Sequence, residues 1–185
     1  KFERGGICRF TVDVTKGNTK AVLTVEKVGK VDLPAPDIFF GNDKMEVTDT
    51  DIYKSDQAFT QGQMITVTGI DNLNEWWIDP DFFEKQSDGA LKFLPINGDY
   101  RVTANAVLKY FSVMALKDGK PAKLQDDGTG AIWAIGKGIG KPSVASSEVG
   151  WEPGKALCLA QVAPKKYQLT LKAGETLKTS GDWEA

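Results

Sequence analysis

Histidine is absent from this sequence, and cysteine occurs only twice. The missing histidine excludes Ser-His-Asp and Cys-His catalysis, histidine-based zinc sites and the commonest general base. Cys8 and Cys158 lie far apart in the sequence and match no metal-binding spacing. We expect both to be small buried residues within strands, with a single disulfide as the alternative. The sequence therefore predicts a protein that is not an enzyme and that holds no metal and no cofactor.

Strong net charge and long apolar runs are also missing. The 23 Lys and Arg residues nearly balance the 25 Asp and Glu residues, and the lysines are spread along the chain. This pattern lacks the clustered positive charge that binding to nucleic acid or to an anionic membrane surface requires. No apolar run is long enough to span a bilayer. The first residues contain neither a methionine nor a signal sequence, so we expect a piece of a longer, processed protein with several domains.

Short segments of alternating apolar and polar residues, separated by Gly, Asn, Asp and Pro, predict an all-β fold. Phe10, Val12 and Val14 lie on one face of the first expected strand. A turn at residues 16–18 leads to the returning strand, residues 21–25. An isolated hairpin is marginally stable in water, so we expect this one to be the tail of a preceding domain or to pack onto another sheet.

The remaining strands follow at the spacing of a β-sandwich. Residues 71–89 interrupt this spacing, and we expect them to form a long loop or a short helix that begins at Pro80. The turn-rich residues 117–128 mark a domain boundary. We expect strands at residues 44–48, 58–68, 91–94, 99–104, 108–116, 131–135, 156–161 and 167–171. The predicted domains are a hairpin (1–30), an immunoglobulin-like β-sandwich (31–128) and a second, incomplete β-sandwich (129–185).

Residues 130–151 carry the clearest functional signal. A short apolar strand with Trp133 leads into a glycine-rich turn and a polar loop, which closes on Gly150 and Trp151. Trp133 alternates with apolar neighbours, so we expect it to be a packing residue. Trp151 instead precedes a Glu-Pro-Gly turn, where an indole can stack on the apolar face of a sugar ring.

The Ile135-Gly136 pair, the loop after it and the Gly150-Trp151 pair resemble the opening of the starch-binding domains in the SusE and SusF type outer-membrane lipoproteins of Bacteroidetes. The resemblance covers residues 129–185 best and implies a surface-exposed, lipid-anchored protein of the cell outer membrane. It implies non-catalytic capture of polysaccharide or oligosaccharide for uptake, beside a SusC/SusD-type import complex. The membrane would be reached only through a lipid anchor outside this chain. The predicted carbohydrate-binding residues are Trp151, Trp183, Tyr167, Lys137, Lys141 and Glu148, with Trp151 as the stacking platform.

Trp76 and Trp77 belong to the densest aromatic run of the chain. Adjacent residues of a strand face opposite sides, so both rings cannot enter one core unless the segment is covered on both faces. We favour a loop that folds back and plugs one end of the first sandwich. The alternative is an exposed interaction surface, which fits a second functional reading as a structural spacer or protein-interaction module. Asp79 and Asp81 lack the spacing of a calcium loop, and a hydrolase would need both carboxylates.

Overall fold

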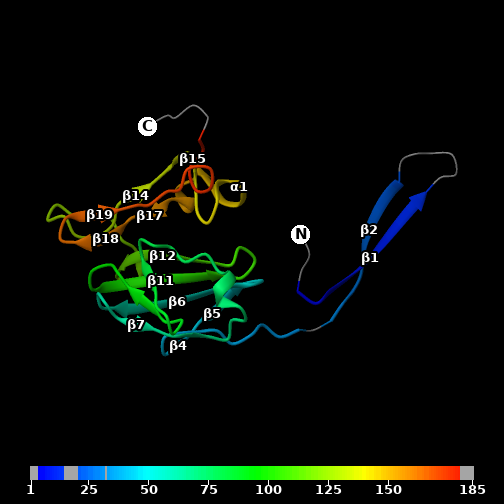
Figure 1. The fold of residues 1–185 in the computed structure, drawn as a ribbon, viewed down its shortest axis with the longest axis horizontal. Coiled ribbons are helices and arrows are strands. Elements are labelled where there is room, and N and C mark those ends of the chain that lie inside the picture. The colour runs from blue at the N-terminus through cyan, green and yellow to red at the C-terminus, as the bar shows by residue number, and fades with distance from the viewer. Residues whose placement is uncertain (1–3, 15–20, 32, 180–185) are drawn as a thin grey trace. The chain divides into compact units, whose positions relative to one another are not determined.

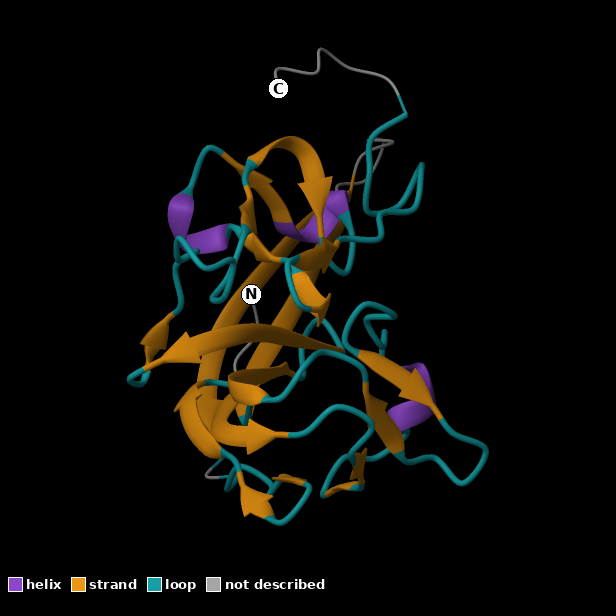
Figure 2. Ribbon diagram, turned by 90° about the vertical axis from the view of Figure 1, so that its left-hand side faces the viewer, coloured by secondary structure: helices purple, strands orange, loops and turns teal. Residues whose placement is uncertain are grey.

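The computed structural model describes residues 4–14, 21–31 and 33–179 and confirms the all-β prediction (Figure 2). It divides into two compact units, Lys1–Ala35 and Pro36–Ala185, each described here by itself. Among the described residues, no helix has the length and apolar character needed to cross a membrane.

The first unit is an antiparallel hairpin of β1 (Gly6–Val14) and β2 (Ala21–Lys30), as the alternation predicts. Phe10 lies opposite Val25 and Val12 lies opposite Leu23, so these side chains share one face. They remain exposed, and Val14 reaches 71%. The predicted turn at 16–18 lies outside the described residues.

The second unit is built around a five-stranded antiparallel sheet with the strand order β13-β12-β11-β6-β5. Alternation explains its two faces: Tyr100, Val102 and Ala104 of β11 are buried, while the residues between them are only half-buried. The strands are β5 (Glu46–Asp49), β6 (Ile52–Phe59), β11 (Gly98–Asn105), β12 (Tyr110–Lys117) and β13 (Lys120–Pro121).

Two three-stranded sheets cover the inner face of the large sheet and complete a β-sandwich. The core between them is aromatic. Phe40 is fully buried and makes edge contacts with Phe59, Phe83 and Phe111, at ring-centroid distances of 6.2, 5.7 and 5.3 Å. The covering strands are β7 (Met64–Ile65), β10 (Leu91–Phe93) and β9 (Phe83–Lys85) in one sheet, and β4 (Asp43–Lys44), β3 (Phe39–Phe40) and β8 (Val67–Thr68) in the other.

The C-terminal segment forms three strand pairs, which lie beyond β12 in Figure 1, and its strand β17 contacts β12. Ala160 is fully buried in the aromatic core of the sandwich. The Ile96 amide donates a 2.8 Å hydrogen bond to the Gln161 carbonyl, which ties the segment to the sandwich. The elements are β14 (Trp133–Ala134), β15 (Gly136–Gly140), α1 (Val144–Ser147), β16 (Glu148–Gly150), the 3-10 helix η2 (Pro153–Lys155), β17 (Leu157–Cys158), β18 (Ala160–Ala163) and β19 (Lys166–Gln168).

These contacts join residues on both sides of the predicted boundary at residue 128. The predicted division into domains at residues 30 and 128 concerns which parts fold by themselves, and it stays a prediction.

Two local predictions were wrong, and one alternative was settled. The glycine-rich turn after Ile135 is the strand β15, in which a Cβ on Gly140 would lie 2.4 Å from the Ser147 carbonyl oxygen. Glycine therefore permits a close backbone approach here rather than a turn. Residues 71–89 follow the loop alternative: no helix begins at Pro80, and the 3-10 helix η1 of this loop is Leu73–Glu75. The strand expected at 58–68 is three strands, and the first of them, β6, begins at Ile52.

Phe40→Ala should lower the free energy of unfolding by about 3–5 kcal/mol, because it opens a cavity among three buried rings. Val47→Ala is the control, since Val47 is 51% exposed and its truncation should change stability by less than about 0.5 kcal/mol. Urea unfolding followed by near-UV circular dichroism measures both values. Equal losses for the two variants would contradict this account of the core.

Candidate functional site

Trp151 sits on a short turn between two defined elements. It follows β16, which pairs with β15 through Gly150 and Gly136, and it precedes η2, which begins at Pro153. Trp151 is 49% exposed and is the most exposed tryptophan of the described residues. The prediction that this indole is held out on a tight bend agrees with its position.

A cavity of about 460 Å³ lies between the outer face of the large sheet and the C-terminal segment. Its floor includes Thr103 of β11 and Ser112 of β12, which are direct cross-strand neighbours. Trp133 contributes an aromatic wall, and its indole N–H donates a 3.0 Å bond to the Ala122 carbonyl, which fixes the ring. Hydroxyls beside an aromatic ring are the lining that suits a small polar ligand with apolar faces.

The cavity has a buried inner end and an exposed mouth. Phe82, Tyr110 and Cys158 line it and are almost fully buried, whereas Gly154 and Lys155 of η2 line it and are exposed. Only three peptide units separate Gly154 from Trp151, so their Cα atoms lie at most about 11 Å apart. The exposed indole and the cavity mouth therefore belong to one region of the surface.

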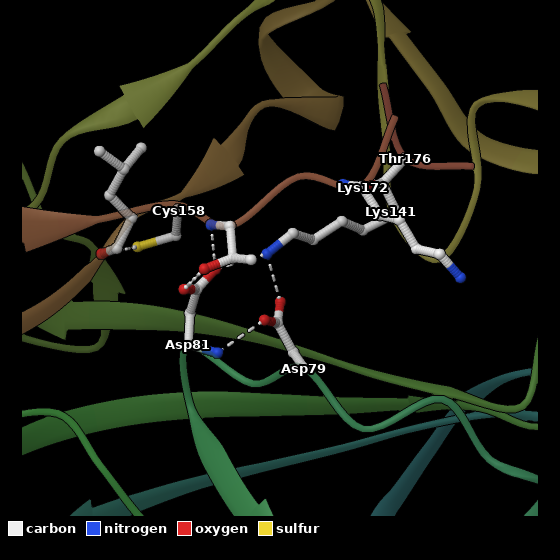
Figure 3. Close-up of polar contacts among 8 residues, drawn as sticks. Asp79, Asp81, Lys141, Cys158, Lys172 and Thr176 are labelled. Carbon is white, nitrogen blue, oxygen red and sulfur yellow. Dashed lines mark hydrogen bonds and ion pairs between the residues drawn. The ribbon is translucent and has the colours of Figure 1, made fainter. Parts of the chain in front are cut away.

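Figure 3 shows a buried ion cluster, of which Lys141 and Asp79 also line the cavity. Lys141 Nζ binds Asp79 Oδ2 at 2.7 Å and Asp81 Oδ2 at 2.8 Å, and the three side chains are at most 2% exposed. The backbone amide and hydroxyl of Thr170 each donate a 2.7 Å bond to Asp81. The cluster thus links residues 79–81 of the sandwich to residues 141 and 170 of the C-terminal segment.

The two carboxyl groups of the cluster have opposite pKa shifts. Burial raises the pKa of Asp79, although Lys141 acts against the shift. Burial also disfavours the charged form of Asp81, but the hydrogen bonds from Lys141 and Thr170 outweigh it and lower the pKa. Asp81 therefore carries the negative charge that holds Lys141, and Asp79 takes up a proton first when the pH falls.

The structure changes the roles of several predicted sugar-binding residues. Lys141 is a correction: its amine is buried between two carboxylates and is not offered to a ligand at the surface. Glu148 Oε1 accepts a 2.8 Å bond from the Gly138 amide and a 3.0 Å bond from Lys178 Nζ, and the amide bond is the main reason for its lowered pKa. Lys137 of β15 is exposed.

Tyr167 on β19 uses its hydroxyl within the protein. The O–H lies 3.1 Å from the Gly128 carbonyl oxygen and 3.3 Å from the Gly130 carbonyl oxygen, so it holds the strand to the 128–130 loop. Among the described residues, neither hydroxyl partner of Tyr167 belongs to the Trp151 turn. Trp183 lies outside the described residues.

The two adjacent tryptophans of the aromatic run follow η1 outside any named strand, and their side chains lie in different surroundings. Trp76 is a core residue that stacks on Phe111 at 4.6 Å, which removes it from any exposed interaction surface. Trp77 is half-buried, lies 5.4 Å from the Tyr110 ring, and has Lys141 Nζ 5.8 Å from its own ring centroid. The preferred reading of this run, a loop that plugs the sandwich, matches these contacts.

Both cysteines are free thiols. Cys158 is buried in β17, and burial raises the pKa of its thiol to about 11. The expectation of burial was wrong for Cys8, which is only partly covered because β1 belongs to a two-stranded hairpin. Among the described residues, no group of three or more His, Cys, Asp and Glu side chains is arranged to hold a metal ion.

Sequence reasoning missed the floor of the cavity and the function of Asp79 and Asp81. Thr103 and Ser112 are ordinary outward residues of strands, and only the C-terminal layer turns their side of the sheet into a cavity. An available signal was the unusual run Asp79-Pro80-Asp81 inside an aromatic segment, because buried carboxylates require a cationic partner.

A family model described as a domain of unknown function (DUF5125) matches residues 17–124, which is more than half of the chain. The chain belongs to the DUF5125 family. A second model, described as a domain of unknown function (DUF5121), matches residues 127–182 and thus the C-terminal layer with Trp151. Neither the curated proteins nor the solved structures gave a match to the chain.

Lys141→Met should destabilise this DUF5125 protein by about 3–5 kcal/mol, because it leaves two buried carboxylates without their cation. Lys137→Met is the matched control four residues earlier: its side chain is exposed, so the change should stay within about 0.5 kcal/mol. Chemical unfolding of both variants measures the difference. A small effect at Lys141 would refute the cluster as a structural tie.

Asp81 should make the protein sensitive to acid. Its pKa in the folded state lies below the ordinary 3.8, so its stabilising contribution is complete above 3.8 and is lost as the pH falls through the lowered value. The contribution of Asp79 to stability changes with pH in the opposite direction, because the pKa of Asp79 is raised in the folded state. Asp81→Asn should therefore flatten the acid-side loss of stability, while Asp79→Asn should leave that loss in place. Unfolding curves from neutral pH to below 3.8 test this, and identical curves for the two variants would rule it out.

Proposed function

We propose that this protein binds polysaccharide or oligosaccharide at the bacterial cell surface without cleaving it and supports glycan capture for uptake. The observation that carries the proposal is the half-exposed indole of Trp151, held on a turn beside a cavity lined by hydroxyl groups. A flat ring on a fixed turn stacks on a sugar with little loss of conformational entropy.

The similarity of Ile135-Gly136 and Gly150-Trp151 to the SusE and SusF starch-binding domains supports the same proposal. In the structure these two glycines face each other across the β15–β16 pair, so both parts of the motif meet beside Trp151. The proposed location is the outer face of the outer membrane, reached through a lipid anchor outside this chain. The proposed partner is a SusC/SusD-type import complex.

The ion cluster favours binding over hydrolysis. A glycosidase uses two carboxyl groups that flank the scissile bond and reach the substrate. Asp79 and Asp81 are instead 1% exposed, and both are held by the same lysine. Their hydrogen bonds are used to join two layers of the protein.

A second candidate function, a spacer or protein-interaction module, is favoured by one different feature. The hairpin of the first unit exposes a row of apolar side chains that includes Phe10, Val12 and Leu23. An exposed apolar row of this kind suits a partner protein better than it suits a sugar. Recovery of a protein partner without any glycan binding would support this alternative.

Trp151→Ala should weaken glycan binding about tenfold or more, because loss of a stacking ring removes on the order of 1 kcal/mol beyond the buried area. Titration calorimetry against malto-, cello-, xylo- and manno-oligosaccharides measures the change. Leu124→Ala is the control, since Leu124 is similarly exposed, at 53%. The site assignment fails if no glycan shows binding that Trp151→Ala removes and Leu124→Ala retains.

A further inference from the structure

The shape and the charged residues of the cavity beside Trp151 indicate which class of ligand fits it and how that ligand enters. Its inner wall contains buried side chains, and its mouth is formed by exposed residues of η2. A platform on an open surface can accept the middle of a polymer. A half-open cavity whose lining includes buried side chains can instead accept a group that enters end-first.

The polar groups of the cavity suit sugar hydroxyls. Thr103 and Ser112 stand side by side on the floor, where each hydroxyl can donate one hydrogen bond and accept others. Both are only half-buried and so open toward the cavity. Trp133 supplies an apolar wall whose orientation is fixed by its bond to Ala122.

The charges of the cavity disfavour an acidic ligand. Two cations are among its lining residues, Lys141 and Lys155. Lys141 is held by Asp79 and Asp81, and Lys155 Nζ lies 2.7 Å from Glu152 Oε1. A carboxylate or sulfate that entered would meet no free cation and would approach two aspartates for one lysine at the inner end.

We infer that this cavity is a subsite for the uncharged terminal residue of an oligosaccharide, while Trp151 stacks on the next part of the same chain. The inference rests on the proposed function and adds to it a ligand class, neutral sugars, and a mode, recognition of chain ends. The short path from Trp151 to Gly154 at the cavity mouth allows one short oligosaccharide to reach both places.

The decisive experiment uses the full chain labelled with 5-fluorotryptophan and followed by fluorine NMR. The resonances of Trp133 and Trp151 are assigned with Trp133→Phe and Trp151→Phe. Neutral trisaccharides from the four glycan series above, and a tri-galacturonide as the acidic probe, are titrated. A neutral trisaccharide should shift both resonances, and the tri-galacturonide should shift the Trp133 resonance at least tenfold more weakly at equal concentration.

Two substitutions at the same residue separate hydrogen bonding from filling of the cavity. Ser112→Ala should weaken trisaccharide binding about fivefold, as expected for one lost hydrogen bond. Ser112→Met should abolish the Trp133 shift and keep the Trp151 shift. Thermal melts check that both variants fold. If Ser112→Met does not fold, the Trp133 shift of the unsubstituted chain alone decides whether the sugar enters the cavity.

Chain-end recognition has its own readout. The trisaccharide and the long polymer of the same glycan are added at equal mass. The trisaccharide should shift the Trp133 resonance far more than the polymer does, because the same mass of trisaccharide carries many more chain ends. Equal Trp133 shifts from equal masses of trisaccharide and polymer would overturn end recognition. A larger Trp133 shift with the tri-galacturonide than with the neutral trisaccharides would overturn the preference for neutral sugars.

The failures can be told apart. If glycans shift only Trp151, the cavity inference is wrong and the proposed surface binding stands. If no glycan shifts either resonance, the proposed function fails and the inference fails with it.

Discussion

The clustering of Lys141 with Asp79 and Asp81 is the interaction on which the arrangement of the second unit depends. An ammonium group removed from water is stable only when counter-charges and hydrogen bonds replace its solvation. Here the replacements come from a loop of the sandwich, while the lysine comes from the end of β15, and Thr170 adds two further bonds from beyond β19. The C-terminal layer is therefore held in one register against the large sheet.

That register creates the cavity of the proposed binding site. The outer face of β11 and β12 would be a half-polar sheet surface without the C-terminal layer. With the layer in place, the same face becomes the floor of a cavity, and η2 and Trp151 are set at its edge. The parts matched by the two family models, residues 17–124 and 127–182, both contribute to this cavity. In this protein the proposed binding site is thus a property of the two parts together.

The paired carboxylates also show why residue type alone is weak evidence for catalysis. Two aspartates two positions apart invite a catalytic interpretation in a protein expected to meet sugars. Burial and a shared lysine give them another function, with one carboxyl group kept charged and the other easier to protonate. Both carboxyl groups are therefore occupied by contacts within the protein.

The sequence by itself determined the class of fold, the hairpin and the exposed position of Trp151, because each follows from local signals. Alternation of apolar residues sets the two faces of a strand, and a tryptophan between a Gly and a Glu-Pro-Gly turn has little local structure to bury it. Tertiary structure decided the burial of Lys141, the use of the Tyr167 hydroxyl and the cavity floor at Thr103 and Ser112. These features join residues tens of positions apart, and a lysine in a loop looks the same in sequence whether water or two distant carboxylates solvate it.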